Sequence, residues 1–250
     1  MDNYGARIDP DKPPQDGEVA LSPQLRWLPG PLADCRILGR WPRGLGNNVW
    51  SDGLWEQMEK VRLEVNPDWF VQIGCDVAAY GLDETAIVVK QGPCVLHAER
   101  HNGWGPQQTM LYLKELCHRF CGRREPRSVA VLIDAVGIGL GVVDHGNGYN
   151  FVPIVAKHGA SDSESYNNQR SELWFRAKKY AEVDLIDISR LPDDERRRLQ
   201  IELLTPTYDL DPMNRLRVEP KEITKKKLRR SPDLADAFNL ACYWLYPTSG

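Results

Sequence analysis

Residues 70–90 read FVQIGCDVAAYGLDETAIVVK, and this stretch constrains the fold of the chain more than any other. Apolar residues recur at every second position from 71 to 77, which is the period of a β-strand. Asp76 therefore lies on the strand face opposite the apolar run, beside the small residues Gly74 and Ala78. A carboxylate on such a strand costs free energy unless a counter-charge compensates it. The stretch predicts either an edge strand whose acid faces water or an acid with a partner elsewhere in the chain.

This strand opens a regular series of elements. A turn signal at 80–83 and a β-branched run at 85–89 complete a hairpin, and residues 94–98 add a third strand. The later elements are expected as a helix at 109–120, a strand at 128–133 that ends at Asp134, a helix over 135–145, a strand at 151–155, helices at 166–181 and 192–204, a hairpin at 207–210 and 216–220, and a last helix at 231–244 with Ser231 as N-cap and Pro232 as first residue. Three antiparallel strands followed by parallel strand–helix units resemble the ribonuclease H-like fold, an α/β architecture with a mixed central sheet flanked by helices.

The N-terminal part of the chain differs in composition from the rest. Residues 1–30 are rich in Pro, Asp and Gly without a sustained period, so we expect a flexible arm. Residues 31–68 contain three tryptophans and a short helical pattern near 54–61, which indicates a linker-like segment that packs on a neighbour. The main domain is then expected over 69–250.

Composition narrows the class of protein. No apolar run approaches the roughly 20 residues needed to span a bilayer, and the polar, acidic N-terminus does not resemble a signal peptide. The six cysteines include no CxxC pair, which favours reduced thiols and an intracellular protein. Cys117, His118 and Cys121 lack a second ligand pair that would complete a zinc site.

Basic residues are unevenly placed along the chain. The net charge of −3 argues against bulk attraction to nucleic acid. A local basic strip can still attract a polyanion, although any one cluster can equally be a solvated helix face. The candidate DNA-binding residues are Lys178, Lys179, Arg196, Arg197, Lys225, Lys226, Lys227, Arg229 and Arg230.

Four aspartates are the candidate catalytic residues and metal ligands. Asp134 closes a strand expected beside that of Asp76, and the carboxyl ends of parallel strands commonly face a site. Asp233 and Asp236 are three residues apart, so they share one face of the last helix. Carboxylates gathered in this way repel one another, and hard cations such as Mg²⁺ relieve the repulsion. Asp83, in the hairpin turn, is an additional candidate ligand, although a turn-capping role is favoured for it.

Five motifs in succession indicate a family. IGCDVAAYGLDETAIVV, VLIDAVGIGLGVVD, YNNQRSELWF, LRVEPKEITKK and SPDLADAFNLA together resemble the nuclease domain of tailed-phage large terminase subunits, over residues 69–246. The resemblance implies an endonuclease that cuts concatemeric double-stranded viral DNA with two divalent metal ions, Mg²⁺ or Mn²⁺. It matches Asp76 to the first metal ligand and Asp134 to the second. Asp233 and Asp236 both fall in the third acidic motif, and which of them binds metal is left open.

The resemblance also implies partners and a location. These are a packaging ATPase domain, the small terminase subunit, the capsid portal and the host-cell cytoplasm. The chain has no GxxxxGK[ST] phosphate loop, so we expect an isolated nuclease portion or the product of a split gene. Nothing in the sequence resembles a base-reading helix, which favours cutting with little sequence specificity.

Two other functions stay open at this point. One is an actin-like or sugar-kinase-type phosphotransferase, because that superfamily also opens with a hairpin carrying an Asp and residues 136–141 could form a phosphate-binding turn. Such enzymes need two similar halves, whereas this chain offers one. The other is a catalytically inactive module that docks on the portal.

Overall fold

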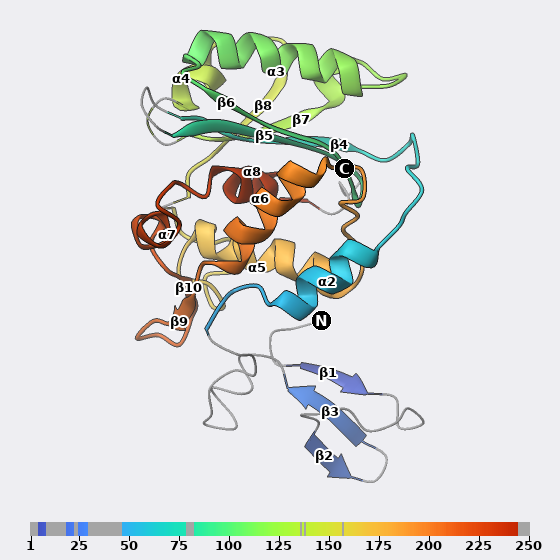
Figure 1. The fold of residues 1–250 in the computed structure, drawn as a ribbon, viewed down its shortest axis with the longest axis vertical. Helices are drawn as coiled ribbons and strands as arrows, with labels where there is room; N and C mark the ends of the chain where they lie inside the picture. The colour runs from blue at the N-terminus through green and yellow to red at the C-terminus, as the bar shows by residue number, and fades with distance from the viewer. Residues whose placement is uncertain are drawn as a thin grey trace.

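A five-stranded mixed sheet forms the centre of the fold (Figure 1). The computed structural model describes residues 47–78, 83–135, 137, 139–156 and 158–244, together with three short strands nearer the N-terminus. The central strands are β4 (Val71–Asp76), β5 (Glu84–Gln91), β6 (Cys94–Asn102), β7 (Ala130–Asp134) and β8 (Asn150–Ile154). In the order β6-β5-β4-β7-β8, the first three are antiparallel, and β7 and β8 run parallel to β4. This confirms the predicted strand order and the predicted ribonuclease H-like architecture.

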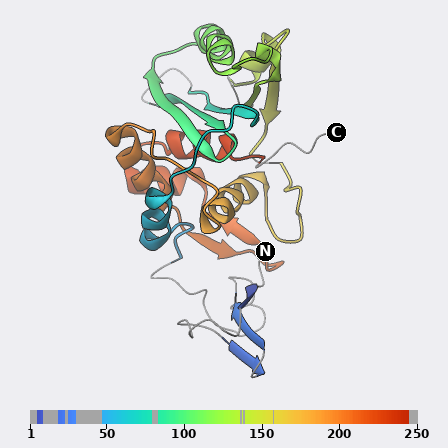
Figure 2. The same ribbon diagram turned by 90° about the vertical axis from the view of Figure 1, so that its right-hand side faces the viewer.

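Helices cover both faces of this sheet (Figures 1 and 2). They are α2 (Asp52–Lys60), α3 (Pro106–Phe120), α4 (Gly139–Asp144), α5 (Gln169–Glu182), α6 (Asp193–Leu204), α7 (Lys221–Leu228), α8 (Asp233–Ala241) and the short 3₁₀ helix η1 (Pro126–Ser128). α3 and α4 lie on one face, while α8 packs on the other with α5 and α6 behind it. The expected hairpin is present as β9 (Tyr208–Leu210) and β10 (Leu216–Val218), which packs beside α5.

The alternation along β4 divides its side chains between the two faces. Its apolar side chains pack against α3, as the period-2 pattern predicts. Gly74 lies on the other face, where an added Cβ would stand 2.0 Å from the carbonyl oxygen of Ala237 and 2.5 Å from the backbone nitrogen of Ala241. Only glycine lets α8 approach the sheet so closely, and this contact brings the start of α8 toward Asp76, two residues further along the strand.

The chain before β4 divides into two parts. Residues Gly5–Ile8, Val19–Ser22 and Leu25–Pro29 form strands β1, β2 and β3 of a small antiparallel sheet within the segment expected to be an arm. Further on, Trp50 and Trp55 are buried in the same core as α5 and α8. The division into a linker-like segment and a main domain stays a prediction, and Trp41 lies outside the described residues.

One local expectation needs correction at the C-terminal end. α8 begins at Asp233 with Pro232 as its N-cap, so Ser231 does not cap it. The carboxylate of Glu202 in α6 accepts a hydrogen bond from the backbone N–H of Ala235 instead, at 3.0 Å. The basic run that follows the hairpin is helical through Leu228 and belongs to α7. Among the described residues, no helix is both long and apolar enough to cross a bilayer.

Candidate active site

The carboxyl ends of β4 and β7 bring two of the predicted acids together. The two strands pair in parallel with Cys75 opposite Ile133, so Asp76 and Asp134 end neighbouring strands, as expected. The negative charge of Asp134 also acts on the carboxyl group of Asp76. Gly139 supports this arrangement, because any larger residue would collide with the carbonyl group of Asp134, against which α4 begins.

A lysine that the sequence analysis did not single out lies among the acids. The ammonium of Lys221, at the start of α7, donates a hydrogen bond to Asp76 Oδ2 at 2.7 Å. The same nitrogen is 3.0 Å from Asp236 Oδ2 and 3.3 Å from Asp233 Oδ1. Three carboxylates from two separate elements therefore converge on one cation.

Each aspartate of α8 uses one oxygen for this contact and has the other fixed by the protein. Asp233 Oδ2 accepts a hydrogen bond from the backbone N–H of Glu84 at 3.0 Å. Asp236 Oδ1 accepts one from the indole N–H of Trp174 at 3.2 Å. Because both side chains are held in the same way, the structure brings both into the cluster and does not favour one over the other.

Burial and mutual repulsion shift the protonation of this cluster. Burial raises the pKa of Asp76 well above its ordinary value, and the charges of the other three aspartates add to that increase, against the opposing effect of Lys221. Burial alone would lower the pKa of Lys221, but Asp76, Asp236 and Asp233 more than reverse this and raise it. Three carboxylates share the Lys221 ammonium and Asp134 lies beside them, so acidic groups outnumber basic ones in the site.

A second group of ion pairs supports the start of α8. Glu202, which caps the helix, is fully buried, and burial raises its pKa despite its bonds to Arg198 and to the α8 backbone. Arg198 also donates a hydrogen bond at 2.7 Å to the carboxylate of Glu84. Glu84 begins β5, and its backbone N–H is the donor to Asp233. Arg100 joins Glu84 to the first turn of α6 through Glu195, at 3.0 Å. The acids of α8 are therefore placed by a buried polar network and not by helix packing alone.

The donor chemistry of the cluster fits a hard divalent cation. All four candidate ligands are carboxylates, the oxygen ligands that Mg²⁺ and Mn²⁺ favour. Among the residues that the structure describes, no three Asp, Glu, His or Cys side chains already surround a single point as ligands of one metal ion would. The ammonium of Lys221 lies between the carboxylates, so a divalent cation would compete with it for the same oxygens.

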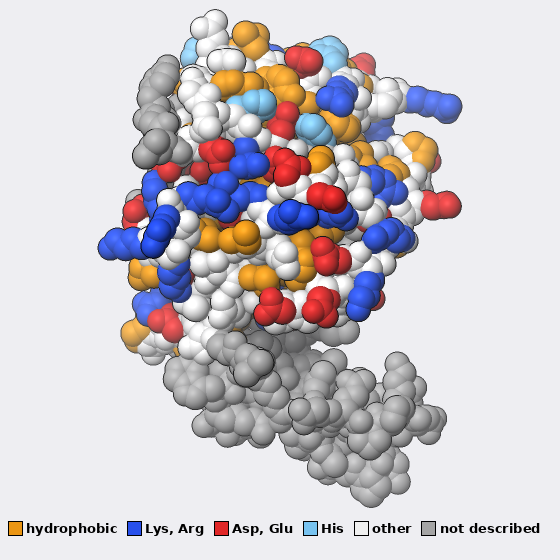
Figure 3. All heavy atoms as spheres, in the orientation of Figure 1, with side chains coloured by type: hydrophobic (Ala, Val, Ile, Leu, Met, Phe, Trp, Pro, Cys, Tyr) orange, Lys and Arg blue, Asp and Glu red, His pale blue; other side chains and the backbone are white. Residues whose placement is uncertain are grey.

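The other predicted residues lie around this centre with different roles. Asp83 forms a salt bridge with Lys225 at 2.7 Å, and the pair joins the hairpin turn to α7. Lys227 is 2.5 Å from Glu219, so it also has a partner. Lys226 and Arg229 are exposed on the same segment. Figure 3 shows Lys and Arg side chains gathered over α6 and α7, mixed with acidic ones.

The remaining basic candidates belong to α5 and α6. Lys178 is near Glu182 at 3.7 Å, and Lys179 lies over the ring of Tyr166. Arg196 pairs with Asp193 in the first turn of α6, whereas Arg197 is exposed. None of these four is in contact with the acidic cluster in the described part of the chain, so a role in DNA binding stays a prediction for them.

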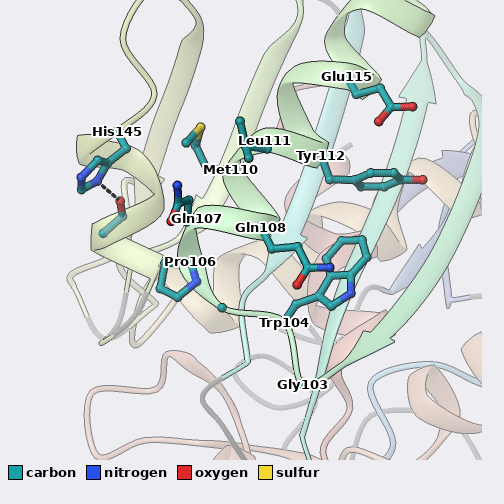
Figure 4. Close-up of a pocket in the computed structure, with 12 residues that line it drawn as sticks. Gly103, Trp104, Pro106, Gln107, Gln108, Met110, Leu111, Tyr112, Glu115 and His145 are labelled. Carbon is teal, nitrogen blue, oxygen red and sulfur yellow. Dashed lines mark hydrogen bonds between the residues drawn. The ribbon is translucent and has the colours of Figure 1, made fainter.

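Two large hollows open on different parts of the surface. One of about 1110 Å³ lies between α3 and α4, lined by residues such as Trp104, Leu111 and His145, and includes none of the candidate aspartates (Figure 4). The other, of about 1020 Å³, is lined by Asp134, Lys221 and the β9–β10 hairpin. We call this second hollow the acidic groove, and it is the one that connects with the candidate chemistry.

Comparison with known proteins places this geometry among solved structures. No family model matches the chain, and no curated protein matches it in sequence. Its structure is similar to the nuclease domain of the large terminase subunit gp2 of bacterial virus Sf6, with a TM-score of 0.68 and 13% identity over 79% of this chain and 99% of that one.

It is also similar to the large terminase nuclease from thermophilic phage G20c with bound magnesium, with a TM-score of 0.56, 18% identity and coverage of 80% of this chain and 98% of that one. The nuclease domain of the Thermus phage P74-26 large terminase gives a TM-score of 0.54 and 18% identity, over 82% and 98% of the two chains. The chain therefore has the fold of the nuclease domains of large terminase subunits.

Proposed function

We propose that this chain is a metal-dependent endonuclease that hydrolyses double-stranded DNA in the packaging of a viral genome. The observation that carries the proposal is the convergence of Asp76, Asp233 and Asp236 on one cation, beside Asp134 at the end of the adjacent strand. The similar solved domains are nucleases of phage terminases, and some of them contain magnesium, manganese, cobalt or calcium.

The four aspartates would hold two divalent ions, Mg²⁺ or Mn²⁺. When bound, such ions activate a water molecule and stabilise the leaving oxygen of a phosphodiester. The protein contributes fixed ligand orientation, because Trp174 and the backbone of Glu84 each hold one oxygen of an α8 aspartate. Asp83 is engaged with Lys225 in this structure, which favours a structural role for it over that of an outer ligand.

The substrate and partners follow from the same proposal. Concatemeric DNA would lie along the acidic groove and contact the basic residues of α7 through its phosphates, with little sequence specificity. A packaging ATPase domain, the small terminase subunit and the capsid portal would be the partners, in the host-cell cytoplasm. A two-halved phosphotransferase is less well supported, because the described residues include a single ribonuclease H-like sheet.

The test is nicking of supercoiled plasmid DNA with Mg²⁺, with Mn²⁺ and with a chelator. The wild-type chain should cut only with metal, and Asp134→Asn should not cut under any of these conditions. Asp68→Asn is the matched control, because Asp68 is exposed in the turn before β4, outside both the cluster and the lining of the acidic groove. Metal-independent cutting, or full activity of Asp134→Asn, would refute the proposal. Binding of DNA without any cutting would favour an inactive docking module instead.

A further inference from the structure

Arg170 is the second basic side chain at the edge of the acidic cluster. It lies in the first turn of α5 and lines both the acidic groove and a small adjoining cavity of about 50 Å³. Asp134 and Lys221 line the same two spaces. The Arg170 side chain is 13% exposed, and its guanidinium packs over the ring of Trp174 at 5.4 Å.

The guanidinium of Arg170 is only partly used by the protein. Nη1 donates to the carbonyl oxygen of Glu219 at 2.7 Å, which fixes the direction of the side chain. Nε and Nη2 are buried, and neither has a hydrogen-bond partner among the residues that the structure describes. Asp236 Oδ1 is 4.0 Å from Nε, which is close enough for an ion pair but too long for a hydrogen bond.

Leaving charged donors buried and unsatisfied is costly, so their placement calls for an acceptor. Water screens such a charge poorly in this position because the side chain is mostly buried. The acceptor that fits is anionic and can take two parallel N–H bonds, and the oxygens of a phosphate meet both conditions. The start of α5 also contributes the positive end of its helix dipole, with Asn168 as N-cap.

We propose that Arg170 binds a non-bridging oxygen of the phosphodiester that lies beside the aspartates; the inference rests on the proposed nuclease function. In hydrolysis a water oxygen forms a bond to phosphorus, the bond from phosphorus to the leaving sugar oxygen breaks, and that oxygen receives a proton. Negative charge rises on the non-bridging oxygens during this step. A fixed guanidinium stabilises that charge and offsets the repulsion between DNA and four aspartates.

A purely positional role makes a different set of predictions. If Arg170 only held Asp236 in place, its loss would weaken metal binding in the absence of DNA. If Arg170 binds phosphate, its loss should leave the metal affinity unchanged or slightly increased, because removing one cation near the carboxylates favours the binding of another. The two roles are therefore separable by a measurement that needs no catalysis.

The experiment compares Arg170→Ala and Arg170→Lys with Arg176→Ala. Arg176 is on the same helix, but its donors are engaged by Glu172 and by the carbonyl oxygen of Tyr243. We expect Arg170→Ala to lower the rate of plasmid cutting by about 10²–10³-fold, Arg170→Lys to lose much of the rate, and the control to keep it. Guanidinium chloride below denaturing concentration should partly restore Arg170→Ala, and urea should not.

Two binding measurements complete the test. Calorimetry with Mn²⁺ and no DNA should give the same or tighter binding for Arg170→Ala. In an Asp134→Asn background, Arg170→Ala should weaken binding of a short DNA duplex by about tenfold, the equivalent of one charge-assisted hydrogen bond. Weaker metal binding, or unchanged cutting and duplex binding, overturns the role of Arg170. A wild-type chain that cuts no DNA overturns the nuclease function, while the duplex measurement still decides for or against the phosphate contact.

Discussion

Replacing Lys221 by methionine removes the ammonium that contacts three of the aspartates, and its effect can be worked out from the structure. The ammonium is 2.7, 3.0 and 3.3 Å from oxygens of Asp76, Asp236 and Asp233. Removing one partner from a buried ion pair costs about 3–5 kcal/mol. The Lys221 side chain is 31% exposed, so water screens part of the loss and we take the lower end, about 3 kcal/mol.

That value predicts two observable changes. For a chain of this size, about 3 kcal/mol corresponds to a fall in Tm of roughly 6–12 °C in the metal-free protein. Affinity for a divalent cation should rise by about a hundredfold, because the cation no longer displaces an ammonium worth about 3 kcal/mol. Added Mn²⁺ should therefore stabilise Lys221→Met more than it stabilises the wild type.

The assay is thermal unfolding with chelator and with a Mn²⁺ series, alongside calorimetry in the absence of DNA. Lys226→Met is the matched control, since Lys226 is an exposed lysine of the same helix. The pH dependence of the free energy of unfolding is a further check. The pKa of Lys221 is raised on folding, so its contribution is fully present below about pH 10 and is lost as pH rises further. Equal Tm values and equal Mn²⁺ affinities for wild type and Lys221→Met would refute the reasoning.

Three further predictions concern neighbouring parts of the molecule. Asp76→Asn should abolish cutting without loss of stability. Because burial raises the pKa of Asp76, the free energy of unfolding of the metal-free wild type should fall as pH rises above the ordinary carboxyl range. Urea unfolding of the variant over the same pH range should not show that fall. Gly74→Ala should cost about 1–3 kcal/mol or more, since its Cβ would meet the α8 backbone, whereas Gly53→Ala meets nothing within 4 Å and should not destabilise in the same urea assay. Neutralising Lys225, Lys226 and Lys227 together should weaken duplex binding and flatten its salt dependence; an unchanged salt slope would limit α7 to a structural role.

Local patterns in the sequence determined the sheet and its acids. The period-2 alternation of β4 assigned Asp76 to the face opposite the apolar run, and the strand–helix order predicted that Asp134 would end the adjacent strand. The three-residue spacing of Asp233 and Asp236 placed both on one helix face. The two face assignments depend on residues close together in the chain, so periodicity alone is enough to read them, whereas the pairing of β4 with β7 was expected from the order of the elements.

The tertiary structure decided which side chains complete the site. Lys221 contacts Asp76, which is 145 residues away in the sequence, and Glu202 accepts a hydrogen bond from α8 at a separation of 33 residues. No local pattern predicts either contact. α7 has one buried residue, Thr224, and its charged sequence carries little helical periodicity. The sequence does not distinguish Arg170 from an exposed arginine. Its burial follows from its contacts with Glu219, just after β10, and Asp236 in α8. Short-range spacing fixes which face a residue occupies, but charge partners at long range are set only when the packed elements bring them into contact.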